Sequence, residues 1–260
     1  MGWIVAYCPD MDLSTCTWPE VEAYLEKSTG IIVPIGSTEQ HGPSGLIGTD
    51  AICAGVTAAD AAGRVGALVA PTIPVGIAQH HMAFAGTITM KPSSLVLLIK
   101  EWVLSLGHHG FDRFFFVNGH GGNVPAIGAA FSEIYGERSL SDAGDNRPDI
   151  RCRQLNWWES PAVKKIVKEL FGDNEGMHAA CSEVSVAQFA HPEHIKNVAL
   201  DPPVAPKPSR FTDALDYRRR FPDGRIGSNP SLANPDAGER LVAAAAGDIA
   251  EAYTRFMKSG

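Results

Sequence analysis

Three potential metal ligands, Glu39, His41 and Asp50, lie within twelve residues of one another in the first fifth of the chain. They follow the apolar run 31–33 in a stretch rich in glycine and proline. Side chains two apart in extended chain point to the same side, so Glu39 and His41 are spaced to bind one ion near a strand end. Asp50 follows a loop, at a predicted helix start, and its side chain could reach the same ion as a third ligand. Surface loops also collect polar residues, so the spacing alone leaves both interpretations open.

His120 is a fourth candidate ligand. It lies within Gly119–Asn123, one residue after the apolar run 114–117, which is typical of a strand buried on both faces. Strand, glycine-rich turn and helix form an α/β unit, and such folds place their sites beyond the carboxyl ends of the strands. The glycines on both sides of His120 would allow its backbone to approach a metal closely. The alternative is a histidine that fills a turn or caps the next helix.

His178 and Glu183 form a second pair of candidates. Five residues on one helix correspond to about 500° of rotation, so the two side chains would not share a face. We therefore predict that His178 lies on the loop before a helix and that Glu183 lies in its first turns. We assign both residues catalytic roles, with His178 as the proton donor to the leaving group and Glu183 also as a metal ligand. A capping histidine on a surface loop is the alternative for His178.

The predicted ligand set indicates the metal and the chemistry. Mixed carboxylate and imidazole ligation suits zinc, manganese or iron, and five ligands exceed what one catalytic zinc takes from protein. We therefore predict two divalent metals (Zn, Mn or Fe) per subunit, bridged by Asp50. Two such metals lower the pKa of a bound water from about 15.7 to roughly 7 and polarise a carbonyl. The scattered cysteines indicate neither a thiolate site nor a disulfide framework: Cys8, Cys16, Cys53, Cys152 and Cys181.

The elements that must position these residues alternate along the chain, which predicts an α/β fold. We expect strands at 31–35, 67–70, 111–118 and 149–158. We expect helices from Thr17, over 51–66 and 92–109, near Pro125, and over 161–171, 179–190 and 235–257. We interpret residues 1–260 as a single domain. Residues 199–236 contain seven prolines and little periodicity, so we expect an irregular excursion ordered by a partner subunit.

Composition excludes several classes of protein. There are 29 acidic and 22 basic residues, a net charge of −7, which disfavours nucleic-acid binding. No apolar run reaches the roughly 18 residues that span a bilayer, and no signal peptide is recognisable. We therefore expect a cytoplasmic protein without nucleic-acid or membrane partners.

The motifs taken together resemble the creatininase (creatinine amidohydrolase) family over about residues 30–240. The resemblance rests on 34–42 with Asp50, on 84–87 (Phe-Ala-Gly-Thr), on 118–123 (Asn-Gly-His-Gly-Gly-Asn), on His178 with Glu183, and on 224–238. It implies a central, mostly parallel β-sheet flanked by helices, and a two-metal centre that includes Glu39, His41, Asp50 and His120. It also implies hydrolysis of a non-peptide C–N bond in a small amide, cyclic amide or formamide, and a homo-oligomer, often a hexamer.

The chain departs from the creatininase pattern after His120. Creatininases carry tyrosine and then a metal-binding glutamate there, whereas this chain has Gly121 and Gly122. We expect Glu183 to replace that ligand and creatinine to be a poor substrate. We predict that Gly121, Trp158 and His81 contact the substrate.

Two alternatives to a small-amide hydrolase stay open. Relatives with the same Gly-His-Gly-Gly-Asn motif include a formamide hydrolase and a peptide-trimming enzyme of redox-cofactor maturation, so a trimming metallopeptidase is the main alternative. A nucleotide-binding module that uses Gly119–Asn123 as a phosphate loop is remote, because neither the Lys-Ser/Thr pair nor a G-x-G-x-x-G motif is present.

Overall fold

The computed structural model describes residues 11–140 and 149–259. Within them, one parallel sheet has the strand order β2-β1-β3-β4. The strands are β1 (Gly30–Ile35), β2 (Leu68–Val69), β3 (Arg113–Asn118) and β4 (Arg151–Asn156). Ile35 pairs with Asn118, and Asn118 pairs with Asn156, so three strands end level with one another. The prediction of a central parallel sheet is confirmed.

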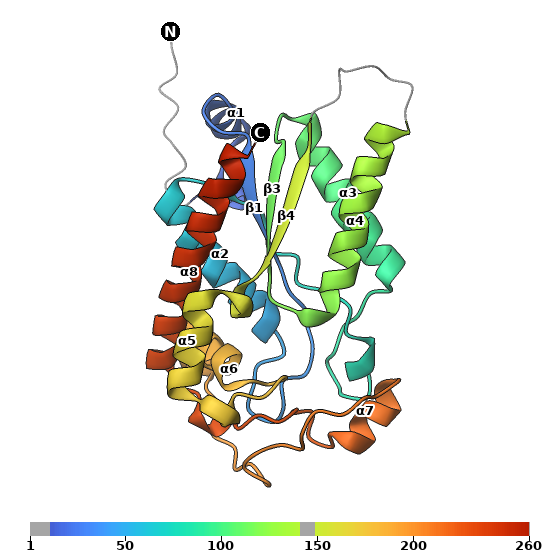
Figure 1. Cartoon of the computed structure of the whole chain (residues 1–260), viewed down its shortest axis with the longest axis vertical. Helices are drawn as coiled ribbons and strands as arrows, with labels where there is room; N and C mark the ends of the chain where they lie inside the picture. Colours follow the sequence, from blue (N-terminus) through green and yellow to red (C-terminus); the bar gives the residue numbers. More distant parts are fainter. Residues whose placement is uncertain (1–10, 141–148, 260) are drawn as a thin grey trace.

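Helices cover both faces of this sheet (Figure 1). They are α1 (Trp18–Leu25), α2 (Thr49–Val65), α3 (Pro92–His108), α4 (Val124–Ser139), α5 (Pro161–Leu170), α6 (Cys181–Ala190), α7 (Ala214–Arg220) and α8 (Pro235–Lys258). Phe115 and Val117 of β3 belong to the core shared with α2 and α8, whereas Phe114 and Phe116 belong to the core shared with α3 and α4. Burial on both faces explains why the strand has an unbroken apolar run.

The helix starts follow the capping chemistry of the sequence. The Thr17 N–H donates to the Glu20 carboxylate at 2.7 Å, as the Thr-x-x-Glu pattern predicts. α2 starts at Thr49, which places Asp50 in its first turn as expected. No helix in the described ranges combines the length and the apolar character that crossing a bilayer requires. Cys53, Cys152 and Cys181 are free, while Cys8 lies outside the described residues.

The segment 199–236 is more regular than we expected, because it contains α7. Asp213 caps this helix by accepting hydrogen bonds from the Leu215 and Asp216 N–H groups, a local signal that the prolines obscured. α7 packs on the short 3₁₀ turn Gln79–His81 of the same chain. Contact of the segment with a partner subunit stays a prediction.

Arg225 holds the same segment together from inside. Its side chain is fully buried, pairs with Asp223 at 2.7 Å and donates to the carbonyl oxygens of Pro202 and Pro203 at 2.8 and 2.7 Å. A buried guanidinium is stable only when its donors are satisfied, so these bonds anchor the proline-rich chain beside the sheet's carboxyl edge.

Candidate metal centre

The predicted ligands converge at the end of the molecule where the strands finish and α6 and α7 lie (Figure 1). Two glycines allow the strand ends to approach α2. A Cβ on Gly36 would lie 2.3 Å from the Ala51 backbone nitrogen, and one on Gly119 would lie 2.1 Å from the Asp50 backbone carbonyl oxygen. The expected close approach at Gly119 is therefore real, but its partner is the backbone of α2, which carries Asp50.

One candidate ligand group consists of Glu39, Asp50 and His120, whose donor atoms lie within 4.8 Å of one another. His120 Nε2 is 3.3 Å from Glu39 Oε2, and its Nδ1 is 3.1 Å from Asp50 Oδ2. His120 Nε2 is also 2.9 Å from the Ile77 carbonyl oxygen. Donation to that carbonyl leaves the lone pair on Nδ1, which faces Asp50, as a ligating histidine requires.

A second group consists of His41, Asp50 and Glu183. His41 Nε2 is 3.0 Å from Asp50 Oδ1 and 3.7 Å from Glu183 Oε1. His41 Nδ1 lies 3.1 Å from the Glu39 carbonyl oxygen, so donation there leaves Nε2 free to ligate. Glu183 is the third residue of α6, and its Oε1 accepts the Ala180 N–H at 2.7 Å.

Asp50 belongs to both groups, with Oδ1 toward His41 and Oδ2 toward His120. A carboxylate whose two oxygens face different groups suits a bridge between two cations. Glu39 Oε1 and Asp50 Oδ2 are buried, and neither has a hydrogen-bond partner among the described residues. Unpartnered buried oxygens are costly, and bound cations would satisfy them. The residues present therefore fit a two-metal centre.

Electrostatics at the centre favours positive charge. Burial alone would lower the pKa of His41, but Asp50, Glu183 and Glu39 outweigh it and raise the pKa to about 10. Burial likewise opposes protonation of His120, whereas Glu39 and Asp50 raise its pKa to about 9. Burial also acts to raise the pKa of Asp50, but His41 and His120 outweigh it and lower that pKa. The carboxylates thus create a negative potential that would equally attract divalent cations.

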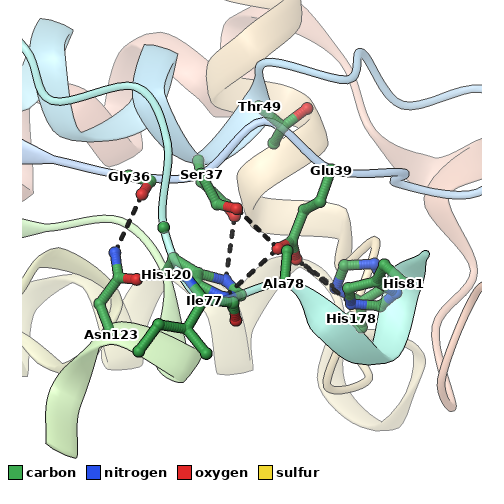
Figure 2. A network of polar contacts seen from close by, with 12 residues as sticks. Gly36, Ser37, Glu39, Thr49, Ile77, Ala78, His81, His120, Asn123 and His178 are labelled. Atoms are coloured by element: carbon green, nitrogen blue, oxygen red, sulfur yellow. Dashed lines mark hydrogen bonds and ion pairs between the residues drawn. The ribbon is translucent and has the colours of Figure 1, made fainter. Parts of the chain in front are cut away.

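His178 lies on the loop before α6, and Glu183 lies in the first turn of that helix, as predicted. The His178 ring stacks on His81, with centroids 4.4 Å apart. Its Nδ1 is 3.8 Å from Glu39 Oε1, and Figure 2 shows Glu39 between His120 on one side and His81 and His178 on the other. Burial, together with the neighbouring His41 and His81, holds the pKa of His178 well below its usual value. The side chain is therefore a neutral imidazole at the centre.

The three predicted substrate residues occupy different environments. Gly121 is exposed, and a Cβ placed on it would meet nothing within 4 Å. His81 is buried, and its Nε2 is 3.3 Å from Glu39 Oε1. Trp158 is half-buried and lines a cavity of about 660 Å³ together with Glu175 and Ser182. The substrate roles of all three stay predictions.

Several residues that brace the centre were not identified from the sequence. Ser37 Oγ donates to Glu39 Oε2 at 2.8 Å. Asn118 donates to the His120 carbonyl oxygen at 2.8 Å and accepts the His120 N–H at 3.1 Å. The Asn123 side chain donates to the Gly36 carbonyl oxygen (Figure 2) and accepts the Ile77 N–H. Gln40, between two predicted ligands, contacts both His81 and His178. In the sequence, the one feature that could have identified these residues is their position, because each lies within a motif that also contains a predicted ligand.

Comparison with known proteins agrees with the geometry. The family model described as creatininase, creatinine amidohydrolase, matches residues 14–253. The mycofactocin precursor peptide peptidase of Mycobacterium ulcerans is 37% identical over 130 residues, covering 46% of this chain and 48% of that protein. The match thus spans about half the length of this mycobacterial relative. The creatinine amidohydrolase of Pseudomonas putida is 24% identical over 247 residues, covering 91% of this chain and 93% of that protein.

Solved structures show the same fold. A mutant creatininase of the Zn-Zn type superposes with a TM-score of 0.82 at 23% identity, covering 95% of this chain and 98% of that chain. Its α/β architecture agrees with the parallel sheet and flanking helices described above. With the family model matching most of its length, this chain belongs to the creatininase family.

Proposed function

We propose that this protein is a metal-dependent amidohydrolase with two divalent cations per subunit, held by Glu39, His41, Asp50, His120 and Glu183. The observation that carries the proposal is the pair of ligand groups that share Asp50. The buried, unpartnered oxygens of Glu39 and Asp50 support it, because bound cations would satisfy them. Zinc, manganese and iron are the metals that suit such a donor set.

When bound, the two cations would supply an activated water and polarise the substrate carbonyl. The protein's own contribution is proton transfer by His178. Because His178 is neutral, it can first take the proton of the attacking water and then deliver it to the leaving nitrogen. Water attack forms the new C–O bond, and the C–N bond breaks as that nitrogen is protonated.

The substrate that we propose is an amide or formamide longer or more branched than creatinine. Gly121 leaves open space where creatininases carry a tyrosine. A Cβ on Gly122 would lie 2.4 Å from His120 Nε2, so a glutamate there would require His120 to move. Glu183 therefore takes the vacant ligand role, and the side of the site next to Gly121 stays unfilled.

Peptide trimming is the second candidate, and a specific observation favours it. The mycobacterial relative that is 37% identical over 130 residues is a precursor peptide peptidase. A chemically similar centre can hydrolyse either a peptide bond or another amide, because the water and the carbonyl are activated in the same way. An open site beside Gly121 suits a chain-like substrate.

Metal analysis followed by a substrate screen tests the proposal. Purified protein should contain between one and two equivalents of Zn, Mn or Fe, and the Glu39→Ala/His120→Ala variant should contain far less. The screen compares creatinine, formamides, cyclic amides and short peptides. Equal metal content in wild type and variant would refute the metal centre. Creatinine turned over faster than every other substrate would refute the proposed substrate class.

We infer also that the protein forms a homo-oligomer, with a hexamer expected from the family resemblance. Met177, next to His178 in the sequence, and Leu215 of α7 are large apolar side chains that are 70% and 72% exposed. Association of subunits over such side chains would remove their apolar surface from water. Light scattering at working concentration should report an assembly, and a monomer would contradict this inference.

A further inference from the structure

Gln40 lies between Glu39 and His41, and its buried side chain reaches the other histidines of the centre. Its Oε1 accepts the Gly42 N–H at 2.8 Å. Only an oxygen can accept this bond, so the amide orientation is determined and Nε2 faces the histidines. Nε2 lies 2.9 Å from His81 Nδ1, 2.9 Å from His178 Nε2 and 3.0 Å from the Gly224 carbonyl oxygen.

The amide has two hydrogens for these three neighbours. His178 Nε2 also lies 2.7 Å from the backbone oxygen of Gln40 itself. A nitrogen approaches a carbonyl oxygen so closely only as an N–H donor, so His178 carries its proton on Nε2 and cannot accept one from the amide. The two amide hydrogens therefore go to the Gly224 oxygen and to His81 Nδ1.

These assignments determine which ring nitrogens face the centre with a lone pair. His81 accepts at Nδ1, so in the neutral ring its proton is on Nε2, 3.3 Å from Glu39 Oε1. His178 donates at Nε2, so in the neutral ring its lone pair is on Nδ1, which points toward Glu39. In a neutral histidine, the hydrogen-bond partner of one ring nitrogen determines whether the other nitrogen carries a proton or a lone pair.

We propose that Gln40 is a positioning residue that sets both tautomers, the side-chain amide for His81 and the backbone carbonyl for His178. His81 then directs an N–H toward Glu39 Oε1, 3.3 Å away, and His178 presents the lone pair that accepts a proton. The inference rests on the proposed function for its purpose, but the tautomers themselves follow from the hydrogen bonds.

The proline-rich segment closes this arrangement from the other side. A Cβ on Gly224 would lie 1.9 Å from Gln40 Oε1, and Gly224 has a φ of +88°, so only glycine suits the position. The Gly224 carbonyl that accepts from Gln40 also accepts from the Tyr217 hydroxyl at 2.7 Å. Gln40 therefore links the N-terminal ligand motif to the segment that carries α7.

Long-range ¹H–¹⁵N spectra of the zinc-loaded protein test the proposal directly, because they distinguish protonated from unprotonated imidazole nitrogens. The His81 and His178 signals are assigned by replacing each residue in turn. In wild type we expect His178 protonated at Nε2 and His81 protonated at Nε2. A proton on Nδ1 of either ring would overturn the inference without any variant.

Two substitutions then separate the side chain from the backbone. Gln40→Glu replaces the amide donor by an acceptor and should move a proton to His81 Nδ1, whereas Gln40→Met should leave His81 in a mixture of tautomers. His178 should stay protonated at Nε2 in both, because the backbone carbonyl persists. Gln188→Met in α6 is the matched control and should change neither ring. An unchanged His81 in Gln40→Glu would contradict the proposal.

Kinetics and metal content add a readout that a merely structural role would not move. Gln40→Met should keep the wild-type metal content, because a thioether is a poor ligand for Zn, Mn or Fe beside carboxylates and imidazoles, while kcat falls about tenfold or more and KM changes little. If no substrate is found but the tautomers are as expected, the proposed function fails and the role of Gln40 stands. If amides are hydrolysed but the tautomers differ, the proposed function stands and the role of Gln40 fails.

Discussion

The two ligand groups share Asp50 but differ in how the chain holds them. In the first group, Glu39 is fully buried and is braced by the Ser37 hydroxyl. His120 is braced by Asn118 and by the Ile77 carbonyl. These residues lie at strand ends or in loops tied to them, so the first group is held rigidly before any ion binds.

The second group depends on a residue from a distant part of the chain. Glu183 comes from α6, its side chain is 17% exposed, and its carboxylate is 3.7 Å from His41. Among the described residues, the bond that holds its Oε1 is the Ala180 N–H. Preorganised ligands lose less entropy on binding. We therefore predict a tight first site and a weaker second site that depends on Glu183.

The largest effect is expected from Asp50→Asn, because Asp50 serves both groups. A carboxylate has two oxygens that share a negative charge, whereas an amide offers one weaker, neutral oxygen ligand. Both metals should therefore be lost, and hydrolysis should fall to background. Elemental analysis of purified protein measures the loss. Asp60→Asn, in an exposed ion pair with Arg64 on the same helix α2, is the matched control and should keep both metals. Retention of both metals by Asp50→Asn would remove the bridging role.

Glu183→Ala should separate the two groups. We expect the loss of about one metal equivalent and of most activity, while Glu39, Asp50 and His120 keep the other metal. Titration of the metal-free variant with zinc should show a single tight site where wild type shows a tight and a weaker one. Two intact sites in the variant would mean that Glu183 is not a ligand and that the second group is wrongly composed.

His178→Ala should affect catalysis without affecting either metal site. Loss of a general acid–base group lowers kcat by about 10²–10⁴-fold, and metal content should match wild type. His178 also forms a candidate ligand group with Glu39 and His41. Loss of one metal in the variant would therefore reassign His178 from proton transfer to ligation.

The smallest effect concerns pH and again distinguishes the groups. Ligation requires neutral imidazoles, and the pKa values of His120 and His41 are raised to about 9 and 10, despite burial, by the surrounding carboxylates. Each site therefore displaces a proton at pH 6–8, and its affinity falls as the pH falls. Burial raises the pKa of Glu183 to about 7, so below that pH the second site must displace another proton.

Zinc titrations at pH 8 and pH 6 measure this difference. Between these values the second site should lose about tenfold more affinity than the first, from the protonation of Glu183. The first site in the same titration is the internal control. Equal losses at both sites would show that Glu183 stays ionised throughout or does not ligate.

Sequence alone predicted most of the fold because most of its helices and strands are specified by local sequence patterns. The apolar runs at β1 and β3, the Thr17 cap and the prolines in the first turns of α3 and α8 each act within a few residues. α7 was missed because Asp213 caps a helix of only 7 residues, too short to show a periodicity. Its aromatic residue Tyr217 packs against residues far away in sequence, which no local pattern reveals.

The residue types of the centre were also readable, but their arrangement was not. Carboxylates and imidazoles at strand and helix ends predicted a metal site, because parallel strands bring their carboxyl ends to one edge. Which atoms face one another depends on contacts between segments up to 184 residues apart, such as Gln40 with Gly224. Local spacing therefore determined which chemistry is possible, while the tertiary hydrogen bonds decided which nitrogen of each histidine is available to perform it.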